Sequence, residues 1–133
     1  MADIIKLAEA VAAEISVPGE AEVCYAPEFD LKGLKELKVV VVPSGLEMKP
    51  ISRSTSEDTM HIQIGVLKRC TEDDIVDLVN TVITIGRGFL DRKIAGATCM
   101  DVKYNPLYSP EHLRERRQFT GVVELVFKSV YSP

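Results

Sequence analysis

Two histidines are the natural candidates for general acid–base chemistry in this sequence of 133 residues. His61 falls on the polar face of an alternating segment, and His112 falls in a short charged run. A general base works beside a nucleophile or an orienting partner, and neither histidine shows such a partner pattern in the sequence. We therefore interpret both histidines as surface or hydrogen-bonded side chains and not as catalytic groups.

Three other short patterns could in principle bind phosphate or a cation. The run Gly86-Arg87-Gly88 falls at the end of a predicted helix, whereas a phosphate-binding loop lies between a strand and the start of a helix. Carboxylates that could hold a divalent ion gather at Glu72-Asp73-Asp74 and at Glu57-Asp58. Helix capping explains the first group, and a solvated loop explains the second. We therefore predict no catalytic residue, no metal site and no cofactor, and we expect that the protein is not an enzyme.

The three cysteines, Cys24, Cys70 and Cys99, are widely spaced and contain no Cys-x-x-Cys pair. Neither a disulfide framework nor a zinc site is indicated by this spacing. We expect reduced thiols that serve mostly as small core residues.

Length and charge narrow the class of protein. The length predicts one domain, residues 1–133. A net charge of -4 disfavours a surface that binds nucleic acid by neutralising phosphates. The sequence shows no secretory signal, and its longest apolar run, Val39–Val42, is too short to cross a bilayer. We therefore expect a protein that is made and folded in the cytoplasm without contact to a membrane.

The apolar spacing predicts the elements that must position any functional side chain. Apolar residues at helical spacing predict one helix from Asp3 to Ile15. They predict a second helix that begins after the cap residue Thr71 and ends by Lys93. A single helical turn is expected at Ser109-Pro110. Strands are predicted at Ala21–Tyr25, Leu37–Val42, Met60–Val66, Ala97–Tyr104 and Gln118–Val130, with an exposed loop at Ile51–Thr59.

This order of elements indicates an α+β fold. We predict an antiparallel or mixed sheet of about five strands with two main helices packed on it. The strand Leu37–Val42 is apolar on both faces, so we expect it to be central and to pair with Met60–Val66. The two glycines around Arg87 predict a kink or close packing of the second helix.

The run from Glu111 to Arg117 carries both signs of charge directly before the longest strand. It is interpreted either as a solvated turn or as a patch that docks onto a neighbouring subunit, since arginine is enriched at interfaces. Reversing the charges of Arg114, Arg116 and Arg117 is expected to weaken oligomers while the monomer stays folded. The candidate interface residues are Arg53, Glu57 and Asp58 from the loop, and Glu111, Arg114, Glu115, Arg116 and Arg117 from the charged run.

Three stretches together resemble small neck proteins of tailed bacteriophages and prophages. They are Tyr108-Ser-Pro-Glu-His-Leu-Arg-Glu-Arg-Arg-Gln-Phe-Thr-Gly-Val-Val-Glu-Leu-Val-Phe127, Ile62-Gln-Ile-Gly-Val-Leu-Lys68 and Val41-Val42-Pro43-Ser44. The resemblance is strongest to the tail terminator, or tail completion, family, and it runs from about Pro27 to Val130.

The resemblance implies a structural virion protein of the tail or neck, assembled in the host bacterial cytoplasm. Six copies would form a ring that caps the tail tube, ends its growth and joins the tail to the head. Its partners would be other copies of itself, the tail tube protein and a head-closure or connector protein, while genomic DNA passes through the lumen without specific binding. Two alternatives stay open. One is a head-closure or adaptor ring, and the other is a small-ligand or enzymatic domain with a deep pocket lined by His61 or Asp101.

Overall fold

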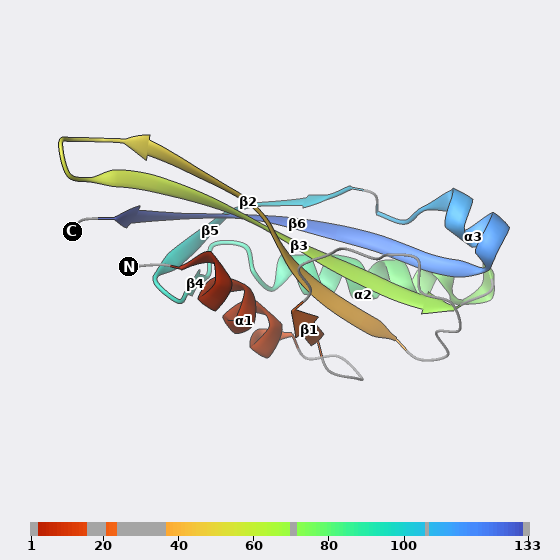
Figure 1. The fold of residues 1–133 in the computed structure, drawn as a ribbon. Helices are drawn as coiled ribbons and strands as arrows, with labels where there is room; N and C mark the ends of the chain where they lie inside the picture. Colours follow the sequence, from red (N-terminus) through yellow and green to blue (C-terminus); the bar gives the residue numbers. More distant parts are fainter. Residues whose placement is uncertain (1–2, 16–20, 24–36, 70–71, 106, 132–133) are drawn as a thin grey trace.

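The computed structural model describes residues 3–15, 21–23, 37–69, 72–105 and 107–131 (Figure 1). A six-stranded sheet forms its centre, and the strand order is β1-β2-β3-β6-β5-β4. The elements are α1 (Ile4–Glu14), β1 (Ala21–Val23), β2 (Lys38–Pro50), β3 (Ser56–Arg69), the 3-10 turn η1 (Glu72–Asp74), α2 (Ile75–Arg87), β4 (Lys93–Ile94), β5 (Ala97–Tyr104), α3 (Pro110–Arg116) and β6 (Gln118–Tyr131).

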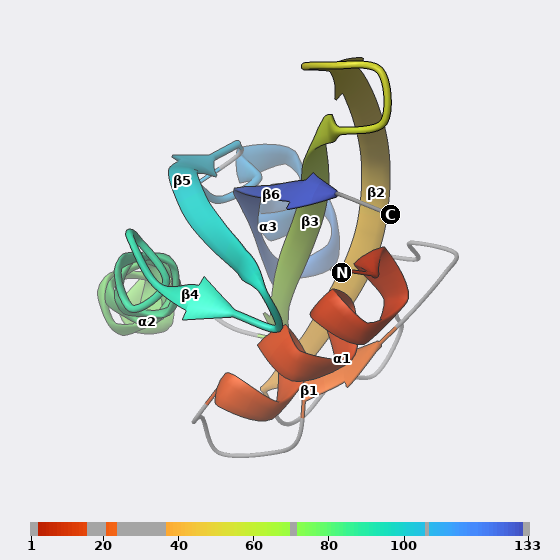
Figure 2. The same cartoon turned by 90° about the vertical axis from the view of Figure 1, so that its left-hand side faces the viewer.

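The sheet is mixed, because β1 runs parallel to β2 while all other neighbouring strands are antiparallel. The two longer helices lie on one face of the sheet, α1 over β1 and β2, and α2 over β5 and β6 (Figure 2). The short helix α3 contacts β6. The predicted α+β fold, with a mixed sheet and two main helices, is therefore confirmed.

A single apolar core lies between the sheet and the two longer helices. Alternation along β6 sends Phe119, Val123, Leu125 and Phe127 toward the helices, and all four are buried. The predicted stripe of α2 is buried at Leu78, Val82, Ile85 and Phe89, whereas Ile75 at the helix start is only partly buried. Each fully buried side chain of this size stabilises the fold by roughly 1.5–3 kcal/mol.

The start of α1 follows the predicted capping pattern. The Asp3 carboxylate accepts hydrogen bonds from the backbone N–H groups of Ile5 at 2.8 Å and Lys6 at 3.4 Å. These contacts satisfy two N–H groups that have no partner inside the helix. The predicted cap Thr71, the strand end at Tyr25, and Cys24 and Cys70 lie outside the described residues.

The central hairpin is longer than the sequence predicts. The expected exposed loop Ile51–Thr59 is wrong over its second half, because Ser56–Thr59 belongs to β3 and pairs with both β2 and β6. Only residues 51–55 connect the strands. The polar composition of Ser56–Thr59 is typical of a loop, but a strand with one solvated face also accepts polar residues at alternate positions.

The predicted central position of the strand at Leu37–Val42 also needs correction. The middle of the sheet is formed by β3 and β6, while β2 has neighbours on both sides only where β1 pairs with Val39–Val41. The predicted pairing of β2 with the strand at Met60–Val66 is confirmed, because Val39 lies opposite Val66 and Val41 opposite Ile64. All four valines of β2 are buried, as their apolar character on both faces predicts.

Helix α2 ends at Arg87, six residues before the predicted limit at Lys93. The chain then turns and forms the short strand β4, which the sequence did not predict. Close packing at Gly86 is confirmed, because a β-carbon there would lie 2.5 Å from the Tyr104 hydroxyl oxygen. The same hydroxyl donates a hydrogen bond of 2.8 Å to the carbonyl of Ile83, which fixes β5 to the helix.

Cys99 is fully buried in β5, and burial raises the pKa of its thiol. A protonated thiol is a poor nucleophile. In a variant with Cys24 and Cys70 replaced by serine, we expect the native thiol to react with a disulfide reagent at least ~100-fold more slowly than in urea. Labelling at equal rates in both conditions would contradict this burial.

The raised pKa also sets a direction for the dependence of stability on pH. Because the folded thiol has a higher pKa than the unfolded one, its contribution is complete below an unfolded pKa of about 8.5 and is lost as the pH rises through the folded value. Burial raises the pKa of Tyr104 as well. Urea unfolding between pH 8 and 11 should therefore show a falling midpoint.

Candidate functional site

Helix α3 is held on β6 by a small polar network. The Nδ1 atom of His112 lies 2.9 Å from the hydroxyl oxygen of Thr120, which also accepts a hydrogen bond of 2.9 Å from the Gln118 side chain. Ser109 caps the helix by accepting a hydrogen bond from the backbone N–H of His112 at 3.3 Å. His112 is thus hydrogen-bonded, as the sequence predicts, and its role here is to attach the helix.

Helix α3 and its C-terminal cap also carry exposed charged side chains. Glu111, Arg114, Glu115 and Arg117 are all exposed, while Arg116 lies in the helix and its side chain is outside the described part. Arg117 ends the helix in the left-handed conformation with φ 50°, and its N–H donates to the carbonyls of His112 and Leu113. The structure therefore brings the predicted charged run together on one solvent-facing helix.

Replacing His112 with alanine should loosen α3 specifically. A half-buried hydrogen bond of this kind stabilises by about 1 kcal/mol, and Thr120 would lose its partner on α3 while keeping the hydrogen bond from Gln118. We expect faster amide hydrogen exchange in residues 110–117 with little change elsewhere. His61→Ala is the matched control, and equal exchange in both variants would contradict the attachment role.

The second candidate region is the arm, defined as Ser44–His61, formed by the end of β2 and the start of β3. Arg53 lies exposed in the turn at its tip. Glu57 is partly buried and lies 3.6 Å from the Lys128 ammonium. Asp58 is only 7% exposed and accepts a hydrogen bond of 2.9 Å from Ser56, so its expected position in an open loop is wrong. The three predicted loop residues therefore do not share one surface.

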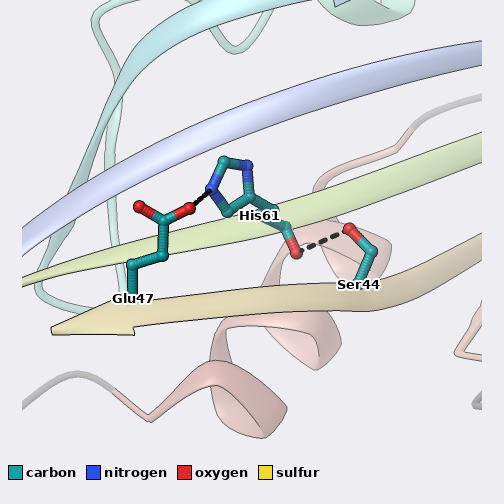
Figure 3. Close-up of polar contacts among 3 residues, drawn as sticks. All are labelled: Ser44, Glu47 and His61. Carbon is teal, nitrogen blue, oxygen red and sulfur yellow. Dashed lines mark hydrogen bonds and ion pairs between the residues drawn. The ribbon is translucent and has the colours of Figure 1, made fainter.

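One face of the arm is polar and points away from the two longer helices. Figure 3 shows His61 beside Glu47, with 3.4 Å between the imidazole Nε2 and a carboxylate oxygen. The Ser44 hydroxyl donates to the His61 carbonyl at 3.2 Å, next to the irregular register between Pro43 and Gly45. His61 thus lies on a polar strand face, as predicted, and its partner is a side chain exposed to solvent.

The opposite face of the arm carries an apolar groove of about 320 Å³ beside the start of α1. Leu46 and Met60 lie opposite each other in β2 and β3, and Met48 lies opposite Asp58. The groove is lined by Asp3, Ile4, Leu46, Met48, Ser56, Asp58, Met60 and Tyr131. Neither His61 nor Asp101 lines it, so it is not the pocket that the ligand-binding alternative expects.

Of the groove residues, the sequence predicts only Asp58 as part of an interface, although it also carries a signal for the apolar ones. Leu46, Met48 and Pro50 alternate with Glu47 and Lys49, which is the period of a strand with one apolar face. Because the strand was predicted to stop before Pro43, this alternation was not used. A proline at an irregular position of an edge strand is compatible with a longer strand.

Helix α3 and the arm, which carry the predicted interface residues, lie at opposite ends of the sheet (Figure 1). Helix α3 precedes Gln118, the first residue of β6, whereas the arm pairs with Tyr131, its last residue. A strand of 14 residues spans roughly 45 Å at about 3.4 Å per residue. Arg53 and the arginines of α3 therefore cannot form one continuous patch on a single subunit.

Among the described residues, the outer edges of the short terminal strands β1 and β4 have no partner strand. The two longest unpaired stretches, called the free edges below, are the outer edge of β2 beyond Val41 and the outer edge of β5 beyond Cys99. Unpaired edges present rows of N–H and C=O groups that can pair with a further strand. The sheet can thus be extended on both sides, by a different strand on each side.

The described residues contain no group of three or more His, Cys, Asp or Glu side chains that could hold a metal ion. No helix in the described ranges is long and apolar enough to span a membrane.

Comparison with known proteins identifies no relative. No protein-family model matches the sequence, and no curated protein is significantly similar to it.

Proposed function

We propose that this protein is a tail terminator, a structural ring subunit of the phage neck that caps the tail tube and joins it to the head. The observation that carries the proposal is the open sheet, whose two free edges belong to different strands. A ring requires two different complementary surfaces on each subunit, and the two edges supply such a pair. The resemblance of residues 108–127 adds the expectation of six copies.

Strand directions favour the joining of these two edges. Along the order β2, β3, β6, β5 each strand runs opposite to its neighbour. Placing β5 of one copy beside β2 of the next therefore continues the antiparallel alternation without a break. The edges that would cause aggregation in a monomer become internal pairs in a closed ring.

The polar sheet face suits a lumen through which DNA moves. Over the half of the sheet next to the arm this face carries four carboxylates, Glu47, Glu57, Asp101 and Glu124, and four lysines, Lys49, Lys93, Lys103 and Lys128, so 4 − 4 gives no net charge. Several of them pair with each other, as Lys103 and Asp101 do at 3.7 Å. A surface without excess positive charge holds DNA weakly, because binding depends on phosphate neutralisation.

The ends of the sheet would then form the two rims of the ring. Helix α3 lies at one rim and the tip of the arm at the other, so one would face the tail tube protein and the other the head-closure or connector protein. This arrangement assigns Arg53 and the charged residues of α3 to contacts between stacked rings, whereas Glu57 faces the lumen and Asp58 lines the groove of the arm. It requires no cofactor and no catalytic residue.

The length of tail tubes tests the proposed function. Tail tube protein that polymerises alone should give tubes of increasing length, whereas addition of this protein should stop growth at one end. Unchanged growth together with binding to a portal or adaptor ring would support a head-closure or adaptor role instead. A specific small ligand bound by monomeric protein, with no effect on tubes, would favour the ligand-binding alternative.

A further inference from the structure

We infer that the groove of the arm receives the α2–β4 corner of a second copy of this chain, with Leu90 as the anchor. The α2–β4 corner is defined here as Arg87, Leu90, Lys93 and Met100. This inference rests on the proposed ring, because it names the side-chain contact that would join neighbouring subunits.

The groove has an apolar floor that the described residues leave uncovered. Helix α1 begins beside it and covers only one end, so Met48 remains 66% exposed although it lies on the helix-covered face of the sheet. Exposed apolar side chains that gather at a concave surface indicate a protein-binding site, whereas single ones do not. An apolar side chain on a partner is the occupant that this floor favours.

The α2–β4 corner presents such a side chain on a rigid turn. Leu90 is 49% exposed between Phe89, which is buried, and Asp91, whose N–H donates to the Cys99 carbonyl at 3.0 Å. Arg92 is fixed as well, since its N–H donates to Phe89 at 3.0 Å and its guanidinium lies 2.8 Å from Glu14. A turn held this way loses little conformational entropy when it binds.

An irregular register in β5 adds a second exposed apolar residue at the same corner. The pairing with β6 shifts between Cys99 and Asp101, and Met100 between them is 53% exposed. Bulges of this kind turn a side chain away from the regular alternation of the sheet. Leu90 precedes Asp91 and Met100 follows Cys99, so the hydrogen bond between Asp91 and Cys99 brings the two exposed apolar residues to the same corner.

The groove and the α2–β4 corner lie on opposite edges of the sheet and at the same height, meaning the same level along the strand direction. One row of paired residues crosses it, from Leu46 to Met60, from Met60 to Phe127, and from Phe127 to Cys99. Figure 2 shows β2 at one edge and β4 with α2 at the other. A contact between surfaces at equal height repeats by rotation about the strand direction and closes a ring, whereas unequal heights would give a helical filament.

Charge on the two surfaces is complementary. Asp3 and Asp58 line the groove, and no described lysine or arginine lies within ion-pair distance of Asp58. On the α2–β4 corner, Arg87 and Lys93 are exposed and form no ion pair with a described carboxylate. Lys93 alternates with the buried Ile94 and so lies on the polar face, whereas Arg87 ends α2 on the helix-covered face and is the cation available to the groove. Since carboxylates with little solvent contact favour a cationic partner, the corner of a second copy fits the groove better than an acidic peptide does.

Disulfide trapping between two chains tests the contact. In a background with Cys24 and Cys70 replaced by serine, one chain carries Met48→Cys and the other Leu90→Cys. The matched control pairs Met48→Cys with Val76→Cys, because Val76 is an exposed apolar residue (70%) at the other end of α2. A disulfide forms only when the two Cα atoms come within about 7 Å.

We expect the Met48→Cys and Leu90→Cys mixture to cross-link at least ~10-fold faster than the control mixture. Adding Asp58→Asn should slow the reaction about threefold at low salt and have no effect at 1 M salt, where the Debye length is about 3 Å. Equal rates in the test and control mixtures would overturn the inference.

A chain with both cysteines separates this inference from the proposed function. If the contact and the ring are both correct, oxidation should give a closed covalent product of one size. An open ladder of products with the same fast cross-linking would support the contact and contradict the ring. Slow cross-linking, with intact rings seen on tail tubes, would contradict the contact and leave the terminator function supported.

Discussion

Replacing Gly121 with alanine should destabilise the fold by about 2–3 kcal/mol, the upper part of the range for overpacked sites. A β-carbon at this position of β6 would lie 2.8 Å from the Leu107 carbonyl oxygen and 3.0 Å from the Val82 side chain. The Leu107 carbonyl cannot move away easily, because backbone hydrogen bonds hold the chain on both sides of it. The N–H of Asn105 donates to the carbonyl of Val122, and the N–H of Ser109 donates to the carbonyl of Thr120. An alanine in an ordinary strand would instead stabilise slightly.

Urea unfolding, followed by circular dichroism, measures this effect. The matched control is Gly45→Ala, where the nearest atom to an added β-carbon is 3.4 Å away in the His61 ring. We expect the control to change the free energy of unfolding by less than about 1 kcal/mol. Similar values for both variants would show that Leu107 does not pack against β6 as closely as the structure indicates.

The second large effect is expected when Arg114, Arg116 and Arg117 are all changed to glutamate. The sequence predicts weaker oligomers, but the position of α3 at the end of the sheet changes this expectation. Because the free edges lie elsewhere, the subunits should still form rings, while binding of the ring to its stacked partner should fall at least ~10-fold. Binding to purified tail tubes and to connector rings, with mass measured in parallel, distinguishes the two effects.

A triple lysine variant of the same positions is the matched control, because it keeps the charge. It should retain most of the binding, apart from bidentate contacts that only arginine makes. The glutamate variant loses a favourable interaction with the helix end, about 0.3–1 kcal/mol for each charge near it. Its circular dichroism should nevertheless show a folded protein. Loss of rings in the glutamate variant alone would return α3 to the contact between ring subunits.

The fold class could be predicted from the sequence because periodicity records burial directly. Helix α1 shows this in Leu7 and Val11, and β6 shows it from Val123 to Phe127, where buried residues alternate with the partly buried Glu124 and Val126. The Ser109 cap followed by Pro110 also marked the start of α3 correctly. Periodicity and capping patterns predict the structure correctly where residues close in the sequence determine it.

The arm and the groove could not be predicted, because their structure depends on distant pairing. Ser56, Glu57 and Asp58 read as a loop by composition, and only their registers with β2 and β6 make them a strand. Burial of Asp58 likewise depends on strands that are 10 and 71 residues away, at Met48 and Ser129. Long-range pairing overrides local propensity in such segments.

Electron microscopy of purified particles, and of tail tubes with the protein added, would show whether this chain forms a ring that caps the tail tube. We expect a sixfold ring at the head-proximal end of the tube, with the strands of each subunit running along the tube axis. A ring seated on the portal would place the protein elsewhere in the neck. Monomeric protein that binds no part of any particle would contradict the proposed ring.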